Sequence, residues 1–220
     1  MAAAEALLGA LLIRRAAGTP DRVGRIVEVE AYGGPEDRAS HARAGRTPRT
    51  APMFGPPGHA YVYLVYGMHD CLNVVTGPDG EASAVLVRAV EPMAGIEAMR
   101  ASSVVRALER RAHRRTEQPR RQALAPDQAG VGRLADHALA SGPGRLCAAF
   151  EIDRTFGGRD LCAAGGALGL LRGTPPDPAS IRRTSRVGVG YALAPWDQIT
   201  WRLALADSPS VSGPRLPATD

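Results

Sequence analysis

The sequence predicts a single domain of the mixed α/β (α+β) class, with a curved, largely antiparallel β-sheet, a protruding β-hairpin and surrounding helices. Short β-rich segments separated by Gly and Pro dominate the first hundred residues, and residues 96–115 follow as a predicted helix. The 220 residues suffice for one domain with its own core. We assign residues 1–207 to this domain, residues 100–130 to an Arg-rich variable insertion and residues 208–220 to a loose C-terminal tail.

The predicted strands begin with residues 25–32. Their alternation places two sets of side chains on opposite faces: Ile26, Glu28, Glu30 and Tyr32 on one, and Val27, Val29 and Ala31 on the other. Residues 60–66 and 71–76 predict a hairpin around residues 67–70. Residues 84–90 predict the next strand, which Glu91 and Pro92 close.

The sequence predicts several further elements outside these strands. Residues 5–12 predict a helix that packs on the core, because this apolar stretch is too short to span a bilayer and no cationic residue precedes it. We therefore expect no association with a membrane. The other expected elements are a long, functional or disordered loop at 33–59, a solvated or disordered basic tract at 106–121, a helix at 134–140, a sharp turn at 142–144, a strand at 165–171 and a Gly-rich strand or loop at 185–191.

Charge and composition restrict the function. The net charge of +5 and pI of about 9.6 make a polyanionic partner plausible without establishing one. All 27 basic residues are arginine, which excludes Schiff-base chemistry by an internal lysine. Three cysteines without paired spacing indicate a reduced, cytoplasmic protein, nucleoid-associated if it is bacterial. No motif implies a symmetric interface, so we expect a monomer.

Glu30 is the first residue that suggests chemistry, because Tyr32 shares its face of the strand. A strand carboxylate is most often a solvated outward residue. An aromatic floor beside a carboxylate would instead suit a site that stacks a base and deprotonates a water. Both interpretations stay open on these residues alone.

Asn73 and Arg88 each interrupt an apolar strand. An unpaired polar group buried there costs roughly 2–7 kcal/mol, so each needs a partner. Backbone groups, or solvent at a sheet edge, could supply one. Alternatively, both line one cavity with Glu30, where the arginine would stabilise the negative charge and help to fix a water.

Tyr61, Tyr63 and Tyr66 lie in the predicted hairpin. Cross-strand packing explains the first two, which share a face. Tyr66 falls at the turn beside Gly67 and Met68, where it is badly placed for a core. An exposed aromatic side chain at a hairpin tip suits wedging between bases.

The histidines are candidate metal ligands. His41, His59 and His69 could join Glu30, but they lie on separate segments without the spacing of a zinc site. We expect no metal and no other cofactor. A metal-dependent hydrolase remains an alternative that retained activity in EDTA would exclude.

Several long segments resemble the alkyladenine (3-methyladenine) DNA glycosylase family. They are GRIVEVEAYGGPEDRASHARAGRTPR at 24–49, MFGPPGHAYVYLVYGMHDCLNVV at 53–75, VLVRAVEP at 85–92, SGPGRLC at 141–147 and RVGVG at 186–190. The resemblance extends from about residue 6 to about residue 212, and so many ordered motifs are far more specific than any single one. It implies a partner, double-stranded DNA that contains damaged purines.

The resemblance also implies roles for individual residues. Three would form the catalytic site: Glu30 as the general base for the attacking water, Arg88 to orient that water, and the main chain at Val187 to complete the water site. Four would form the base pocket: Tyr32 and Tyr63 to sandwich the flipped base, His41 to hydrogen-bond at the wall and Asn73 to exclude the exocyclic amino group of normal guanine. Tyr66, with Met68 beside it, would enter the DNA in place of the extruded nucleotide.

The implied activity is a monofunctional glycosylase of base-excision repair that hydrolyses the N-glycosidic bond of alkylated or deaminated purines, without lyase activity. An alkylated purine is cationic, so it leaves easily and stacks well on tyrosine. The alternative is a non-catalytic nucleic-acid-binding module on the same fold. His69 and Asp70 depart from the family pattern, and the negative charge of Asp70 would weaken contacts with phosphates.

Overall fold

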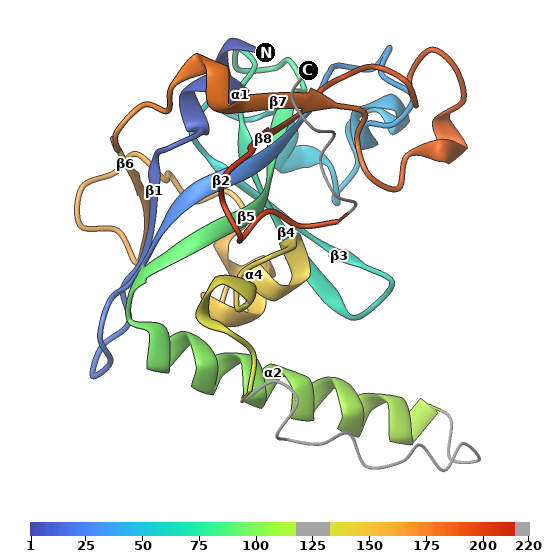
Figure 1. Cartoon of the computed structure of the whole chain (residues 1–220). Coiled ribbons are helices and arrows are strands. Elements are labelled where there is room, and N and C mark those ends of the chain that lie inside the picture. Colours follow the sequence, from blue (N-terminus) through green and yellow to red (C-terminus); the bar gives the residue numbers. More distant parts are fainter. Residues whose placement is uncertain (118–132, 214–220) are drawn as a thin grey trace.

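The computed structural model describes residues 1–117 and 133–213 and confirms the predicted α+β class (Figure 1). The strands in this part of the chain are β1 (Leu11–Arg14), β2 (Arg22–Tyr32), β3 (Ala60–Val65), β4 (His69–Val75), β5 (Ala84–Ala94), β6 (Leu168–Leu171), β7 (Ile181–Thr184) and β8 (Arg202–Leu205). The helices are α1 (Ala2–Leu7), α2 (Ile96–Glu117) and α4 (Pro143–Ala149), with 3-10 turns at His41–Ala44, Ala51–Phe54, Asp136–Ala138, Arg154–Phe156, Pro178–Ser180 and Gly190–Ala192.

Strand β2 organises the sheet. The strand order is β3-β4-β5-β2-β1-β6, every pair is antiparallel, and β8 joins β7 to β2. Along one edge β2 pairs with β5, while its other edge is shared by β1, opposite residues 22–25, and β8, opposite residues 28–30. The register with β5 shifts on both sides of Glu28, as at a β-bulge. The stretch around Glu28 and Glu30 is therefore enclosed by strands on both edges.

The hairpin of β3 and β4 projects from the body of the protein (Figure 1). The predicted hairpin is confirmed, but its turn is Tyr66 to Met68, and His69 and Asp70 already belong to β4. Tyr66 and Gly67 have φ values of 51° and 67°. This left-handed backbone is the conformation that a tight hairpin turn requires.

The core lies between the sheet and the helices. Val27 and Val29 of β2 belong to the same hydrophobic cluster as Leu146 of α4 and Phe150 at the C-terminal cap of α4, and all four are fully buried. Each such side chain contributes about 1.5–3 kcal/mol on burial. Helix α4 packs against β4 on one side and α2 on the other (Figure 1). It begins at Pro143, where a sharp turn was expected, because proline suits the first position of a helix.

Several expected elements are wrong in detail. The helix expected at 5–12 ends at Leu7, because residues 11–14 pair with both β2 and β6. The strand expected to close at Pro92 continues to Ala94, with Pro92 at a register shift opposite Gly24. Only a short 3-10 turn forms within 134–140. Residues 185–191, expected as a strand or a loop, form a loop that leads into the 3-10 turn at Gly190–Ala192. Strands β1, β7 and β8 were not predicted.

The expected basic tract and tail also differ from the structure. The tract that begins at Arg106 continues helix α2 to Glu117, and the rest of it lies outside the described residues. Within the expected tail, residues 208–213 pack on the protein, with Ser210 and Ser212 buried, while residues 214–220 lie outside the described part. No helix in the described ranges is long and apolar enough to cross a membrane.

Candidate active site

Glu30 is a fully buried carboxylate with three partners in the described part of the chain. The Val187 backbone N–H donates to Oε1 at 2.7 Å, and the Tyr32 hydroxyl donates to Oε2 at 2.8 Å. Arg88 Nη1 lies 3.3 Å from Oε1. A buried charge is costly unless it is paired and hydrogen-bonded, and these groups meet both conditions. The solvated-carboxylate interpretation is therefore wrong, because Glu30 and Tyr32 share an inner face.

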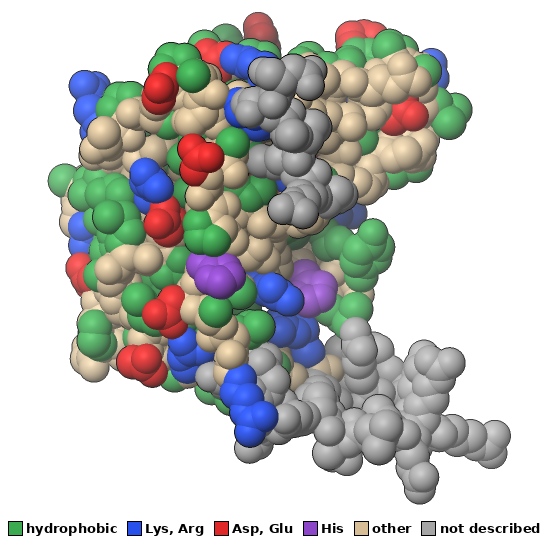
Figure 2. Space-filling view, viewed as in Figure 1, with side chains coloured by type: hydrophobic (Ala, Val, Ile, Leu, Met, Phe, Trp, Pro, Cys, Tyr) green, Lys and Arg blue, Asp and Glu red, His purple; other side chains and the backbone are tan. Residues whose placement is uncertain are grey.

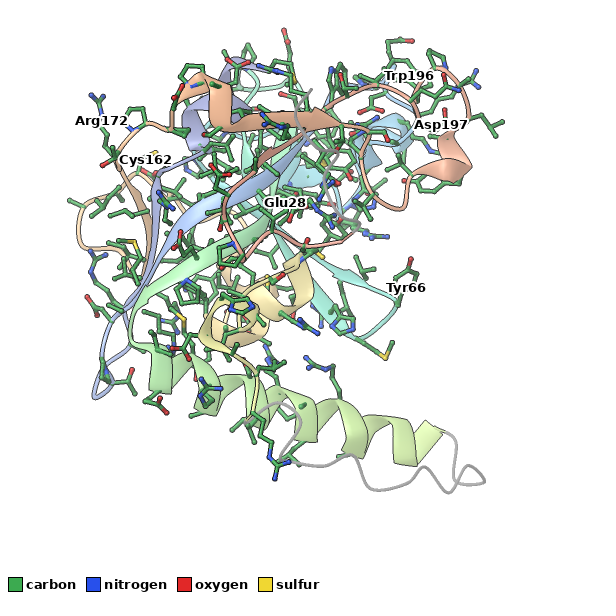
Figure 3. All side chains as sticks on the ribbon, viewed as in Figure 1. Glu28, Tyr66, Cys162, Arg172, Trp196 and Asp197 are labelled. Atoms are coloured by element: carbon green, nitrogen blue, oxygen red, sulfur yellow. The ribbon has the colours of Figure 1, made fainter. Side chains whose placement is uncertain are left out.

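Glu28, two residues earlier, is also fully buried (Figure 3). Its Oε1 accepts from Nε of Arg88 and Nε of Arg202, both at 2.7 Å, and its Oε2 accepts from the Ser212 backbone N–H at 2.7 Å. Burial alone would raise the pKa of Glu28, but Arg88, Ser212 and Arg202 hold it below its ordinary value. Arg88 is thus buried between two carboxylates, not at a sheet edge.

A second buried ion pair lies beside Val187. Both Nη atoms of Arg186 contact the Asp37 carboxylate, at 2.6 and 3.0 Å, and they also donate to two backbone carbonyls. The guanidinium stacks on the rings of Tyr32 and Trp201, at 4.8 and 5.1 Å from their centroids. Such stacking is worth about 0.5–2 kcal/mol. Arg186 therefore holds together the Tyr32 ring and the segment whose amide binds Glu30.

Glu28, Arg202 and Asp37 support this site but were not identified from the sequence. The alternation along β2 already placed Glu28 on the face of Glu30, and that signal could have identified it. Arg202 lies in a strand that was not predicted, and Asp37 lies in a segment without periodicity. No local pattern could have identified these two as partners of the site.

An aromatic cavity of about 50 Å³ lies next to Tyr32. Its lining residues are Tyr32, Ala39, Ser40, His41, Met53, Tyr61, Tyr63, Asn73 and Tyr191. The structure thus brings together the four residues predicted for a base pocket. Glu30 and Arg88 do not line the cavity, and Glu30 is connected to it through the Tyr32 hydroxyl.

Hydrogen bonds hold the polar side chains of this cavity. Asn73 Nδ2 donates to the backbone carbonyls of Tyr61, at 3.1 Å, and Cys71, at 3.4 Å, so the amide is both satisfied by backbone and placed in the wall. His41 Nδ1 lies 3.0 Å from the Tyr61 hydroxyl, and its ring meets Tyr63 edge-on at 4.5 Å. Burial, with the nearby Arg49 charge, lowers the pKa of His41, which is therefore neutral at pH 7.

Tyr66 and Met68 lie away from this cavity, at the hairpin turn. The Tyr66 side chain is 87% exposed and projects from the tip (Figure 3). Met68 is partly buried and lines a larger hollow on another side of the hairpin. The structure therefore separates an exposed tip aromatic from the enclosed aromatic cavity.

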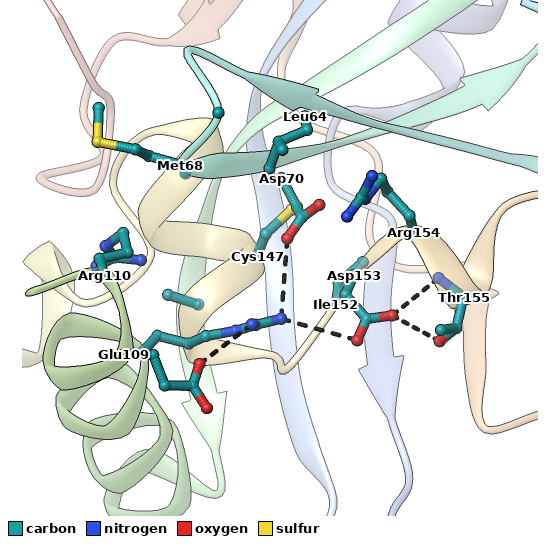
Figure 4. Close-up of a pocket in the computed structure, with 14 residues that line it drawn as sticks. Leu64, Met68, Asp70, Glu109, Arg110, Cys147, Ile152, Asp153, Arg154 and Thr155 are labelled. Atoms are coloured by element: carbon teal, nitrogen blue, oxygen red, sulfur yellow. Dashed lines mark hydrogen bonds and ion pairs between the residues drawn. The ribbon is translucent and has the colours of Figure 1, made fainter. Parts of the chain in front are cut away.

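The larger hollow, of about 530 Å³, lies between the hairpin, α2 and α4 (Figure 4). Arg106 of α2 crosses it, 3.8 Å from Asp70 of β4, 3.8 Å from Asp153 and 3.2 Å from Glu109. Asp70 therefore faces the basic helix beneath the hairpin. Its carboxylate lies near Arg106 in this hollow, which argues against the expected weakening of phosphate contacts.

We expect Asp70→Asn to stabilise the protein at pH 7. Burial raises the pKa of Asp70, and its Oδ1 is buried without a hydrogen-bond partner among the described residues. Ionisation of Asp70 therefore disfavours the folded state above the raised pKa, and this penalty disappears below the unfolded-state pKa of about 3.9. Thermal unfolding of the variant and the wild type should differ in Tm at pH 7 and coincide near pH 3.

Asp153→Asn is the control of opposite sign. Burial raises the pKa of Asp153, but hydrogen bonds from Thr155 and the charge of Arg106 outweigh it and lower the pKa. Asp153 thus stabilises the fold above its unfolded-state pKa and loses this effect as the pH falls through its folded-state pKa. A lower Tm for Asp70→Asn at pH 7 would contradict the account of Asp70.

A metal centre has no ligand set in the described ranges. Within residues 1–117 and 133–213, no group of three or more His, Cys, Asp or Glu side chains is arranged to hold a metal ion.

Cys71 lies opposite Tyr63 in the hairpin, and burial raises the pKa of its thiol to about 12. This thiol stays protonated at neutral pH and is a poor nucleophile.

Comparison with known proteins gives a consistent result. The family model for methylpurine-DNA glycosylase matches residues 1–209. A protein of Anaeromyxobacter dehalogenans named "Putative 3-methyladenine DNA glycosylase" is 45% identical over 96% of this chain and 80% of its own length. A protein of Streptomyces avermitilis with the same name is 43% identical over 94% of this chain and 83% of its own length. The "DNA-3-methyladenine glycosylase" of Mus musculus is 43% identical over 95% of this chain and 57% of its own length.

Proposed function

This chain belongs to the methylpurine-DNA glycosylase family, and from this premise we propose that it is a monofunctional glycosylase of base-excision repair. It flips alkylated or deaminated purines, of the 3-methyladenine, 7-methylguanine and hypoxanthine class, out of duplex DNA. It then hydrolyses the N-glycosidic bond with a water that Glu30 activates. The observation that carries this proposal is the fully buried Glu30 carboxylate, held by Val187, Arg88 and Tyr32 directly beside an aromatic cavity.

The carboxylate is arranged to act on a water. Among the residues that the structure describes, only Tyr32 donates to its Oε2, which keeps a lone pair for a water proton. As the bond to the purine breaks, the sugar gains oxocarbenium character, and an ionised Glu30 nearby would stabilise that positive charge. General-base catalysis of this kind contributes about 10²- to 10⁴-fold to a rate.

The aromatic cavity is the proposed base pocket. Tyr32 and Tyr63 would stack on the two faces of the purine, and a cationic alkylated base gains about 0.5–2 kcal/mol from such faces. The cavity of about 50 Å³ is small for this purpose, so side chains at its mouth must move when a base enters. Tyr191 is the candidate at the mouth, since it is 63% exposed and lies beside Ala39.

His41 and Asn73 would select the base. Burial raises the pKa of Tyr61 to about 12, so its hydroxyl keeps its proton and can donate to Nδ1 of the neutral His41. The Nε2–H of His41 is then left as a donor at the pocket wall. Asn73 is held rigidly by two backbone carbonyls, which suits a residue that excludes an exocyclic amino group by contact.

An arginine-rich segment beside the pocket would contact the DNA backbone. Arg38, Arg43, Arg46 and Arg49 are all exposed. Arg49 also lies over the Tyr63 ring, 5.6 Å from its centroid, which places this segment next to the cavity. Guanidinium groups bind phosphates well, so this edge is the proposed contact with the strand that carries the lesion. Figure 2 shows an indentation of the surface on the right-hand side of the view, between the upper part of the molecule and the projecting hairpin.

Tyr66→Ala should slow base release from duplex DNA, because Tyr66 is the proposed plug for the space that the flipped nucleotide leaves. Base–aromatic stacking is worth about 1–3 kcal/mol, so we expect a loss on the order of 10-fold in the single-turnover rate. A single-stranded oligonucleotide with the same lesion needs no plug and should react at nearly the wild-type rate. Equal losses on both substrates would contradict the wedge role.

The monofunctional activity is tested with a duplex that contains one hypoxanthine, in the presence of EDTA. We expect abasic sites that alkali converts to strand breaks, while the strand stays intact without alkali. The chain has no lysine to form an imine with the sugar. Strand cleavage without alkali, together with an enzyme–DNA adduct trapped by borohydride, would contradict this part of the proposal.

A further inference from the structure

We propose that Glu28 is a positioning residue of this site, which holds Arg88 so that only its Nη1 faces Glu30. This inference rests on the proposed glycosylase function and adds a residue that acts through Arg88. Each guanidinium nitrogen of Arg88 has its own partner. Nε donates to Glu28 at 2.7 Å, Nη2 donates to the Ser212 hydroxyl at 3.2 Å, and Nη1 lies 3.3 Å from Glu30.

Glu28 is itself held rigidly on both oxygens. Its Oε1 is shared between Arg88 and Arg202, and its Oε2 receives the Ser212 backbone N–H. Arg202 closes the ring, because its Nη2 donates to the Ser212 carbonyl at 2.7 Å and its Nη1 to Thr184 at 3.1 Å. The orientation of Arg88 is therefore set by a network that does not include the base pocket.

Two negative and two positive side chains form this buried cluster, so their charges balance. Glu28 and Glu30 face Arg88 and Arg202, and all four side chains are buried. If Glu28 were neutral, two guanidinium groups would face one carboxylate. Arg88 Nε would also lose its charged acceptor, and the guanidinium could turn to bind Glu30 through two nitrogens. A bidentate pair would occupy the carboxylate lone pairs that the water requires.

Ser212 and Gly213, at the end of the described chain, pack against this cluster of charged side chains. Gly213 has a φ of 77°, and a Cβ there would lie 3.7 Å from Val187 and 3.9 Å from both Arg88 Nη2 and Arg202 Nη2. Ser212 supplies the amide that fixes Glu28. The segment that was expected to be a loose tail therefore belongs to the support of the site.

The test compares Glu28→Gln with Glu151→Gln in the full-length chain. Glu151 also pairs with a buried arginine, Arg22, at 3.0 Å, but it contacts neither Arg88 nor Glu30. Two quantities are measured: the single-turnover rate of hypoxanthine release, and the Kd for a duplex with a tetrahydrofuran abasic analogue. A displaced catalytic group costs up to about 100-fold, so Glu28→Gln should lower the rate by roughly 10- to 100-fold with little change in Kd. Glu151→Gln should react at the wild-type rate.

A double-mutant cycle with Arg88→Met separates positioning from a general structural effect. If Glu28 acts through Arg88, adding Glu28→Gln to Arg88→Met should change the rate by no more than about 2-fold. The inference would be overturned if the rate losses of Glu28→Gln and Arg88→Met multiply in the double variant. It would also be overturned if Glu151→Gln loses as much of the rate as Glu28→Gln. If Glu28→Gln does not fold, Ser212→Pro replaces it. Ser212→Pro removes the amide donor to Glu28 and also the hydroxyl that accepts from Arg88. It is therefore compared with Ser212→Ala, which removes the hydroxyl alone, and it should lower the rate further than Ser212→Ala while Kd is kept. A normal rate for Ser212→Pro would overturn the inference.

The two proposals fail in different ways. An active wild type with an unaffected Glu28→Gln would overturn the positioning role alone. A wild type that binds lesion DNA and releases no base would overturn the glycosylase function, and the role of Glu28 would fall with it.

Discussion

Glu30→Gln is expected to lower the rate of base release by about 10²- to 10⁴-fold, the contribution of a general base. Glutamine has nearly the same shape, and its carbonyl oxygen can still accept from Val187 or Tyr32. It cannot take a proton from water. Binding to a lesion duplex should therefore stay within a few-fold of wild type, because the residues proposed to contact DNA are unchanged.

The measurement is single-turnover release from a hypoxanthine duplex, with Kd obtained from the same oligonucleotide. Glu36→Gln is the matched control, because Glu36 is exposed in the loop after β2. It should react like the wild type. A Glu30→Gln variant that folds and still releases base at more than about a tenth of the wild-type rate would mean that another group activates the water.

Arg186→Met should destabilise the fold by about 3–5 kcal/mol, the cost of removing one partner of a buried pair. Asp37 is 1% exposed and would remain as a buried, unpaired carboxylate. The substitution also removes the cation that stacks on Tyr32 and Trp201. Urea unfolding of the variant and the wild type, followed by circular dichroism, measures the change in the free energy of unfolding.

Arg183→Met provides the matched control three residues away. Arg183 pairs with Glu5 at 2.5 Å, but the two side chains are 47% and 44% exposed. An exposed pair contributes about 0–1 kcal/mol, so this change should have little effect. Similar losses of stability in Arg183→Met and Arg186→Met would show that burial of the Asp37 pair is not what makes it important.

Much of the fold could be predicted from the sequence, because the strongest sequence signals are local. The two-residue period along residues 25–32 predicts the inner face of β2, and the hairpin follows from two β-rich runs around Gly67. Strand β1 was missed because LLIR has no alternation of its own, and its conformation depends on pairing with β2 and β6. Tertiary pairing therefore decided the elements whose local pattern was weak.

The site was predictable where residues lie on patterned strands or in the segments that carried the family resemblance. Glu30, Tyr32 and Asn73 were found in this way, and the structure brings them together around one cavity and its adjoining carboxylate. Arg202 and Asp37 were not found, because their partners, Glu28 and Arg186, lie 174 and 149 residues away from them in the chain. Long-range ion pairs of this kind leave no periodic signal in a single sequence.

The central claim is that this chain hydrolyses the bond between a damaged purine and its sugar. The most direct measurement is chromatographic detection of free 3-methyladenine and 7-methylguanine released from methylated duplex DNA, in EDTA, by the wild type and by Glu30→Gln. The account predicts free base from the wild type alone, while the variant still binds the DNA. Binding without release by either protein would contradict it and would indicate a DNA-binding module on a repair fold.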